Sequence, residues 1–300
     1  MSQKAIFTFL AFILGLGVFL LSPSLYAEEK RLGMEFAENL QIVVNIPATK
    51  MTVYKNGKPI RHFKVAVGAP AFPTPVTKFH FKQIIWNPGW NPPDSPWAKN
   101  AKPEPPGPNN PLGPVKLPMQ QAVLIHGTSK PWSIGHPASH GCIRMNSKDA
   151  IELGTFLQTE LLPNENNTWE NKYSKTRWQT VVKNLPKAVR VRTIYEPFEL
   201  YKTELTLHPN FYGRKEELLN AIVEHLLAQG VYTAPLDLEK IKNLRATIKT
   251  NGAIVALEDL FYGTPDVVAL NFSLDPICQV QNDVAGDPTL VASSAMESNF

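Results

Sequence analysis

The chain has 300 residues, 43% of them hydrophobic and 19% charged, and its formal net charge is +4. This composition is typical of a globular protein with one large domain and an appendage, or with two domains. The sequence contains only two cysteines, Cys142 and Cys278, which excludes a disulfide-dense scaffold, and no long basic run or signature predicts nucleic-acid binding.

The first 27 residues have the pattern of a secretory signal peptide. Lys4 precedes an almost wholly apolar run from Ala5 to Leu21, and Ala27 is a small residue at the expected cleavage site. An uncleaved membrane anchor is the alternative, although the run is shorter than the ~20 residues that a spanning helix needs. We expect the rest of the chain to lie beyond the inner membrane, in the periplasm, touching the membrane only if the segment is uncleaved.

The following part of the sequence is β-rich. Alternating and apolar stretches predict strands, in chain order, at Leu40–Ile46, Lys50–Lys55, Arg61–Val67, Thr77–Trp86, Gln121–Ile125 and Ala188–Ile194. The second and third of these flank Asn56-Gly57, which is a strong hairpin signal. The sequence therefore predicts a sheet that begins with an antiparallel hairpin.

Residues 86–118 separate two of these strands and contain eleven prolines together with Trp86, Trp90 and Trp97. A loop of this length inside a domain is typically a lid or a binding loop. A polyproline linker between domains is the alternative. We favour the loop, because the strands on either side are both needed for one sheet and the tryptophans provide rigid contact surface.

Helices are expected between and after the last strands. Apolar spacing and capping residues predict them from Asn146 or Ser147 to Leu157, and at Trp178–Lys183, Arg214–Gln229 and Leu238–Leu244. Residues 198–285 are interpreted as a C-terminal module that contains helices and has no assigned role. Residues 286–300 are small and polar, and we expect a flexible tail there.

The segment from His126 to Asn146 carries the chemistry. Cys142 lies in a Ser-His-Gly-Cys turn, and His126 stands sixteen residues upstream at the end of an expected strand. A thiol attacks a carbonyl only as the thiolate, so it needs a nearby base or cation. A strand that ends at His126 and a loop that returns to Cys142 would bring the two together. The sequence therefore predicts a Cys–His dyad.

Other readings of these residues are less favoured. Four potential ligands, His126, His136, His140 and Cys142, lack the spacing of common zinc sites, so we expect no metal and no cofactor. In a papain-like peptidase the cysteine precedes the histidine, whereas here it follows. A disulfide with Cys278 would block Cys142 as a resting nucleophile, and we interpret Cys278 as a lone thiol.

Several motifs in order along the chain resemble one family. From about Gln41 to Thr193 the sequence resembles the L,D-transpeptidase catalytic domain (YkuD type) of bacterial cell-wall enzymes. The resemblance is carried by Met51–Lys58, Val65–Gly68, Thr74-Pro75, Gly107–Gly113, Ile125–Thr128 and Ser139–Asn146. It implies a fold that is mainly β with helices (α+β), with a mixed β-sandwich or barrel-like catalytic domain over residues 40–195.

The resemblance also implies roles for single residues. Cys142 would be the nucleophile. His126 would be the general base that takes the thiol proton, or would hold the thiolate as an ion pair, with its imidazole oriented by the carbonyl of Gly127. Backbone N–H groups of His140, Gly141 and Cys142 would form the oxyanion hole. Arg144 would bind a substrate carboxylate, and Asn146 would be a helix cap or a substrate contact. The residues implied in orienting the nucleophile or in the oxyanion hole, besides Gly127, are Ser139, His140, Gly141 and Cys142.

The activity that the resemblance implies is acyl transfer through a thioester. The enzyme would cleave the bond between the diamino acid and D-Ala of a peptidoglycan tetrapeptide stem and form 3→3 cross-links, and carbapenems would acylate the same thiol. The acceptor could instead be an envelope protein or water. A hypothesis of another class is a non-catalytic protein that binds the cell wall.

Overall fold

The computed structural model describes residues 34–201, 204–214, 220–224, 236–248 and 252–262. The expected signal peptide, the expected flexible tail and Cys278 lie outside the described residues. So does most of the helix predicted at Arg214–Gln229, of which residues 220–224 are described and are helical. Residues 35–276 form one compact unit, and of the other unit, residues 1–34 with 277–300, only Met34 is described.

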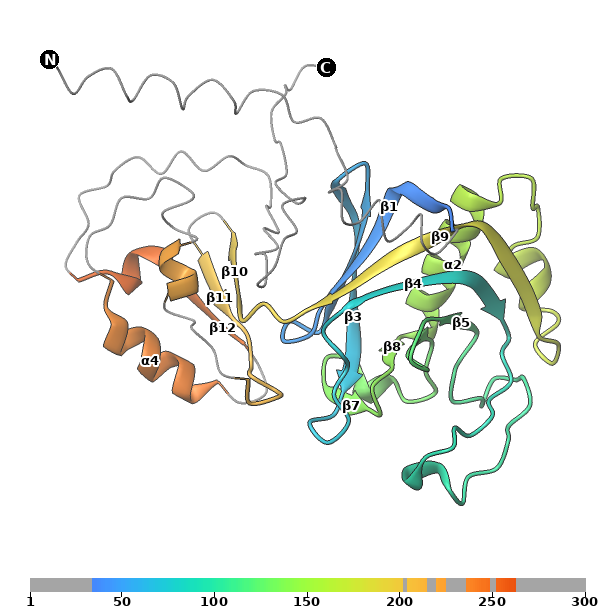
Figure 1. The fold of residues 1–300 in the computed structure, drawn as a ribbon, viewed down its shortest axis with the longest axis horizontal. Helices are drawn as coiled ribbons and strands as arrows, with labels where there is room; N and C mark the ends of the chain where they lie inside the picture. The colour runs from blue at the N-terminus through green and yellow to red at the C-terminus, as the bar shows by residue number, and fades with distance from the viewer. Residues whose placement is uncertain (1–33, 202–203, 215–219, 225–235, 249–251, 263–300) are drawn as a thin grey trace, which may run out of the picture. The chain divides into compact units, whose positions relative to one another are not determined.

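The larger of the two sheets within the described residues closes on itself. Its nine strands follow the order β2-β1-β9-β4-β5-β6-β8-β3-β7, and β2 also pairs with β3, so the sheet forms a barrel-like ring with β7 added on β3 (Figure 1). Most neighbours are antiparallel, but β1–β9, β6–β8 and β3–β7 are parallel. The strands are β1 (Phe36–Asn45), β2 (Lys50–Lys55), β3 (Lys58–Gly68), β4 (Lys78–Trp86), β5 (Val115–Pro118), β6 (Leu124–His126), β7 (Pro137–Ser139), β8 (Ile143–Met145) and β9 (Val181–Ile194).

The predicted hairpin is confirmed. Asn56 and Gly57 both have positive φ, 53° and 75°, as a type I′ turn requires. The turn joins β2 and β3, whose antiparallel register runs from Lys55 opposite Lys58 to Lys50 opposite Lys64. Because β2 pairs with β1 on its other side, this local turn also provides the contact that closes the ring.

The core of the barrel lies against helix α2 (Ser147–Leu161), which begins where the sequence predicts it. Trp86 is fully buried, stacks on Tyr173 at 4.6 Å between ring centroids, and donates from Nε1 to Gln158 Oε1 of the helix at 3.0 Å. A Cβ on Gly154 would lie 3.1 Å from the Trp86 ring. The glycine therefore lets the helix approach the indole closely.

The helix predicted at Trp178–Lys183 is wrong. Its second half belongs to β9, where Val181 pairs with Trp86 and Val182 with Ile85. Consecutive β-branched residues at Thr180, Val181 and Val182 favour a strand, and pairing with β4 decides the outcome. Strand β9 therefore begins seven residues before the predicted Ala188–Ile194, at Val181.

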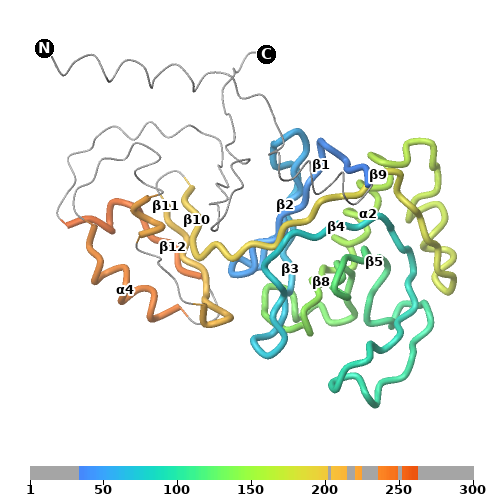
Figure 2. The backbone as a smooth tube through the Cα atoms, viewed as in Figure 1, coloured from blue at the N-terminus to red at the C-terminus, as the bar shows by residue number. Residues whose placement is uncertain are grey.

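The chain after Phe198 has a hydrophobic core of its own. Strands β10 (Phe198–Tyr201), β11 (Glu204–Leu207) and β12 (Ala253–Ala256) form an antiparallel three-stranded sheet, and helix α4 (Leu238–Thr247) accompanies it (Figure 2). The sequence predicts helices in this module, and the structure adds a sheet that the prediction lacked. Its strands have only four residues each, which is too short for an alternating pattern to identify a strand reliably.

Within the described residues, no helix is both long enough and apolar enough to cross a membrane.

Candidate active site

His126 and the residues that directly follow Cys142 lie on neighbouring strands. Strands β6 and β8 are parallel, with Ile125 opposite Ile143 and His126 opposite Arg144. Continued by one step, this register places Cys142 beside Leu124, on the same face of the strand pair as His126. Strand spacing and rise then put the Cα atoms of Cys142 and His126 about 8 Å apart. The topology thus unites two residues that lie sixteen positions apart in the sequence.

The imidazole of His126 is buried, with 5% of the residue exposed. Its Nδ1 lies 2.5 Å from the carbonyl oxygen of Gly127, and since a carbonyl only accepts, Nδ1 carries the hydrogen. Nε2 is then the unprotonated nitrogen of the neutral ring, the one that can accept a proton. The sequence-predicted contact between Gly127 and His126 is present.

The same environment sets the protonation of His126. Burial lowers the pKa of His126 to about 4. The hydrogen bond with the Gly127 carbonyl acts to raise this pKa, and the positive charge of Arg144 acts to lower it further. The ring is therefore neutral at pH 7, and Nε2 is a base rather than an acid in the resting protein.

Cys142 carries a free thiol that is partly exposed. Its Sγ lies 3.9 Å from the carbonyl oxygen of Ala122, a weak contact. Burial raises the pKa of the Cys142 thiol, while the backbone of Leu124 and the charge of Arg144 act in the opposite direction. A neutral thiol beside a neutral imidazole is therefore the resting state, and the thiolate forms only when the proton is transferred.

The turn before Cys142 is held by the side chain of Ser139. Its Oγ donates to the carbonyl of Cys142 at 2.5 Å and accepts from the N–H of Gly141 at 3.1 Å. Gly141 has φ of +102°, a conformation that side chains rarely adopt. The N–H of Gly141, which the resemblance implies as an oxyanion donor, donates to Ser139 in this structure. The N–H groups of His140 and Cys142 remain as candidates.

A second brace reaches the same turn from the loop after β3. Thr74 is fully buried, and its Oγ1 accepts from Gly68 N at 2.8 Å and donates to the carbonyl of Gly141 at 2.9 Å. A Cβ on Gly68 would lie 2.2 Å from the carbonyl oxygen of Phe72, so the loop folds directly over this glycine. The Thr74-Pro75 pair stood among the sequence motifs, but nothing local indicated this contact.

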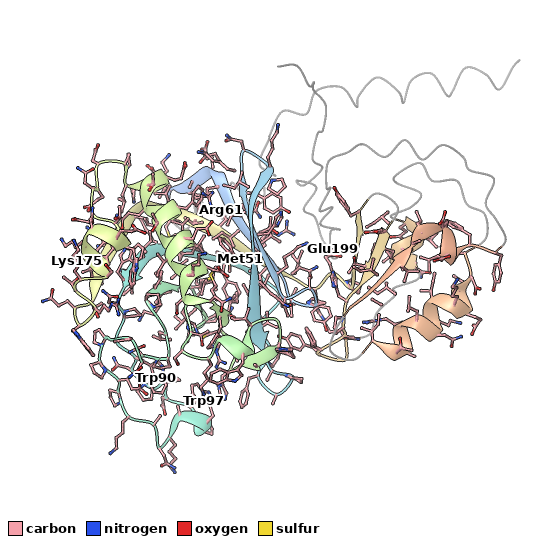
Figure 3. All side chains as sticks on the ribbon, turned by 180° about the vertical axis from the view of Figure 1, so that it is seen from behind. Met51, Arg61, Trp90, Trp97, Lys175 and Glu199 are labelled. Atoms are coloured by element: carbon pink, nitrogen blue, oxygen red, sulfur yellow. The ribbon has the colours of Figure 1, made fainter. Side chains whose placement is uncertain are left out.

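The proline-rich loop contributes an aromatic contact to the turn. Short helix η1 (Pro96–Ala98) carries Trp97, whose ring stacks on His140 with centroids 3.9 Å apart and planes at 10° (Figure 3). Phe72 contacts the same imidazole at 4.7 Å. Residues from three loops therefore meet at His140, two positions before Cys142, and this agrees with the interpretation of residues 86–118 as a functional loop within the domain.

Arg144 and Asn146 flank the strand that follows Cys142. Arg144 is half-buried, and its Nη1 donates to the carbonyl of Ala138 at 3.0 Å, which spans the turn. Burial lowers the pKa of Arg144. Asn146 is the N-cap residue of α2, and its side chain hydrogen-bonds the Asp149 carboxyl group and opposes the burial that raises the pKa of that group. Its side chain thus supports the start of the helix.

Among the described residues, no group of three or more His, Cys, Asp or Glu side chains is arranged to hold a metal ion. The chemistry that the described groups can perform is nucleophilic attack by a thiol next to a neutral base.

Comparison with known proteins identifies one family for the part of the chain that carries this site. Residues 39–182 match the model of the L,D-transpeptidase catalytic domain (YkuD). A Bacillus subtilis protein named as the L,D-transpeptidase YkuD is 33% identical over 116 residues, which are 39% of this chain and 59% of that protein. An Escherichia coli protein named as the L,D-transpeptidase ErfK/SrfK is 30% identical over 134 residues, 39% of this chain and 43% of that protein.

Solved structures of L,D-transpeptidases resemble the chain at lower identity. An L,D-transpeptidase from Mycobacterium smegmatis is 17% identical with a TM-score of 0.32, over 51% of this chain and 58% of that chain. An L,D-transpeptidase from Stackebrandtia nassauensis is 15% identical with a TM-score of 0.32, over 55% of this chain and 60% of that chain. The chain therefore spans less than two thirds of the length of these relatives.

Proposed function

Residues 39–182 belong to the L,D-transpeptidase catalytic domain family, and on that premise we propose that the chain is a peptidoglycan L,D-transpeptidase with Cys142 as its nucleophile. Its donor is a tetrapeptide stem that ends in D-Ala, and its acceptor is the side-chain amine of a second stem. The products are a 3→3 cross-link and free D-Ala. No cofactor is needed.

Acylation is the first half of the reaction. Nε2 of His126 takes the thiol proton as Sγ of Cys142 attacks the carbonyl carbon of the diamino acid, at its L-centre. The N–H groups of His140 and Cys142 donate to the oxyanion, and each such donor is worth on the order of 3 kcal/mol. The C–N bond to D-Ala then breaks, the imidazolium returns its proton to the leaving amine, and a thioester remains.

Deacylation uses the same groups in reverse order. The amine of the second stem attacks the thioester carbonyl and gives its proton to His126. The C–S bond breaks, and the sulfur recovers that proton to regenerate the thiol. Arg144 binds a carboxylate of one of the stems, for which its planar guanidinium is suited.

The observation that supports this proposal most directly is the register of β6 and β8. It pairs His126 with Arg144, two residues after Cys142, and the carbonyl of Gly127 accepts the Nδ1 hydrogen, which leaves Nε2 as the unprotonated nitrogen. A catalytically silent wall-binding protein would have no need for this tautomer or for two independent braces on the cysteine turn.

The experiment that tests the proposal combines a covalent probe with a transfer assay. The full chain is incubated with imipenem, and mass spectrometry is expected to find an adduct on the peptide that contains Cys142. With disaccharide-tetrapeptide as substrate, a dimer joined 3→3 is the expected product, whereas free tripeptide would indicate hydrolysis. Folded protein that gives neither adduct nor product contradicts the proposal.

We also propose that the reaction takes place in the periplasm. The support is the apolar run from Ala5 to Leu21 with a small residue at position 27, which has the pattern of a secretory signal. The substrate of the proposed reaction is a component of the cell wall, and this agrees with export.

The stack of Trp97 on His140 predicts a moderate effect on acylation. Replacing Trp97 with Ala removes an aromatic contact worth ~0.5–1.5 kcal/mol, so the rate of acylation by imipenem is expected to fall about three- to tenfold. The matched control is Trp132→Ala, since Trp132 is 71% exposed and belongs to the spacer between His126 and Cys142. Equal rates in the two variants would show that the stack does not support the turn.

A further inference from the structure

Tyr212 reaches the nucleophile turn from outside the part of the chain that matches the family. The match ends at residue 182, and Tyr212 lies in the segment that follows strand β11. Its ring packs against the core of the barrel rather than against the core of the C-terminal module. A residue of the C-terminal part of the chain is therefore integrated into the catalytic half.

The hydroxyl of Tyr212 makes two hydrogen bonds with the loop beneath the turn. It donates to the carbonyl of Gly68 at 3.0 Å and accepts from the N–H of Thr74 at 3.0 Å. Burial raises the pKa of Tyr212, so the group remains a donor throughout the neutral range. The hydroxyl thus links Gly68, at the end of β3, to Thr74 in the loop that follows.

Thr74 in turn holds the peptide next to the nucleophile. Its Oγ1 donates to the carbonyl of Gly141, which is the residue directly before Cys142. The chain of contacts is short and consists of hydrogen bonds between 2.8 and 3.0 Å. Displacement of Thr74 would turn the Gly141–Cys142 peptide, whose N–H is a proposed oxyanion donor.

Tyr212 itself is fixed by a compact turn. Its N–H donates to the hydroxyl of Tyr195 at 3.0 Å, and that hydroxyl donates to Asn210 Oδ1 at 2.8 Å. Asn210 also bonds both the N–H and the carbonyl of Arg214, which closes the turn around Gly213. These hydrogen bonds fix the position of the phenol relative to Tyr195 and Asn210.

We propose that Tyr212 is a positioning residue for the nucleophile, and that residues 210–214 complete the active site of the catalytic domain. The inference rests on the proposed function, because it assumes that Cys142 is the reacting group. It gives one segment of the C-terminal part of the chain a role in catalysis, where the family resemblance provides none.

The test compares variants that lose one hydroxyl each. Tyr212→Phe keeps the ring and its packing, and is expected to lower the limiting rate of imipenem acylation about tenfold, with less than a threefold change in the half-saturating concentration. The matched control is Tyr173→Phe, which removes a hydroxyl bonded to the side chain of Gln158 at 3.3 Å, a contact that is not among the hydrogen bonds of the turn. It is expected to change the melting temperature but not the rate.

Two further variants examine the link through Thr74. Thr74→Val is expected to slow acylation at least as much as Tyr212→Phe, and Thr74→Ser, which keeps the hydroxyl, is expected to restore most of the rate. The double variant Tyr212→Phe with Thr74→Val should show less than the product of the two single effects, because both remove the same brace. Independent, multiplicative effects would contradict the link.

The readouts separate failure of this inference from failure of the proposed function. If imipenem acylates the wild type but Tyr212→Phe reacts at the same rate, the positioning role is overturned and the proposed function stands. If the wild type is not acylated, the rate of Cys142 alkylation by iodoacetamide replaces that measurement. Tyr212→Phe is then expected to differ from wild type by threefold or more, and equal rates would overturn the inference.

Discussion

Replacing Cys142 with Ala is expected to abolish both imipenem acylation and acyl transfer, with a loss of at least about 10⁴-fold in the transfer rate. A covalent mechanism has no substitute for its nucleophile, and removal of a nucleophile typically costs this much or more. The variant should fold normally, because the thiol is partly exposed and its contact with Ala122 is weak. Mass spectrometry and a muropeptide transfer assay measure the two losses, and thermal unfolding checks the fold.

The control for this experiment is the second cysteine of the sequence. Cys278→Ala should keep full acylation and transfer, because the proposed mechanism uses only Cys142. A covalent adduct that persists in Cys142→Ala would place the reactive group elsewhere. Cys142→Ser is expected to react much more slowly than the wild type, since a hydroxyl beside a neutral imidazole is a much poorer nucleophile than a thiol.

The sequence predicts those parts of the fold that local signals determine. The hairpin at Asn56-Gly57 follows from the turn residues alone, and the start of α2 from its capping residues. The helix expected at Trp178–Lys183 fails for the opposite reason, because pairing of Val181 and Val182 with β4 is a contact with residues almost one hundred positions away. Propensity over six residues does not outweigh that pairing.

The candidate site shows the same division. The motif predicts that His126 and Cys142 lie close together, but it does not predict the parallel pairing of β6 and β8. The tautomer of His126 was implied by the resemblance to the family. The involvement of the Gly141 N–H with Ser139 was missed, because it depends on how a single side chain rotates into the turn.

The contacts of Trp97 and Tyr212 illustrate what sequence cannot supply. The tryptophans of residues 86–118 indicate a contact surface, but nothing in the pattern names His140 as the partner. Tyr212 lies in a stretch without periodicity and outside the family match, so no signal distinguishes it from other tyrosines. Such contacts arise from the packing of loops, which have no repeating pattern to read.

Replacing His126 with Gln is expected to slow acylation by imipenem about 10²–10⁴-fold at pH 7, because the variant lacks the base that takes the thiol proton. Gln is uncharged and polar, so it places no new charge in the buried site. The loss should depend strongly on pH. The pKa of His126 is about 4, so the neutral ring is present at every pH above 5 and the wild-type rate should be nearly flat from pH 5 to 8.

In the variant only spontaneously formed thiolate reacts. Burial raises the pKa of Cys142, so the thiolate fraction, and with it the rate, should rise about tenfold for each pH unit from 6 to 8. The difference in acylation rate between His126→Gln and the wild type should therefore become smaller as the pH rises. The control His136→Gln changes an exposed histidine in the same segment and should follow the wild type at every pH.

The wild-type profile above pH 8 distinguishes a neutral pair from an ion pair. A thiolate–imidazolium pair loses its activating cation when the imidazolium deprotonates, so its rate falls at alkaline pH. A neutral thiol with a neutral imidazole gains thiolate instead, and its rate rises. Because the structure lowers the pKa of His126 and raises that of Cys142, we expect the rise. A falling rate above pH 8, or a defect in His126→Gln that is constant from pH 6 to 8, would show that His126 does not act as the base.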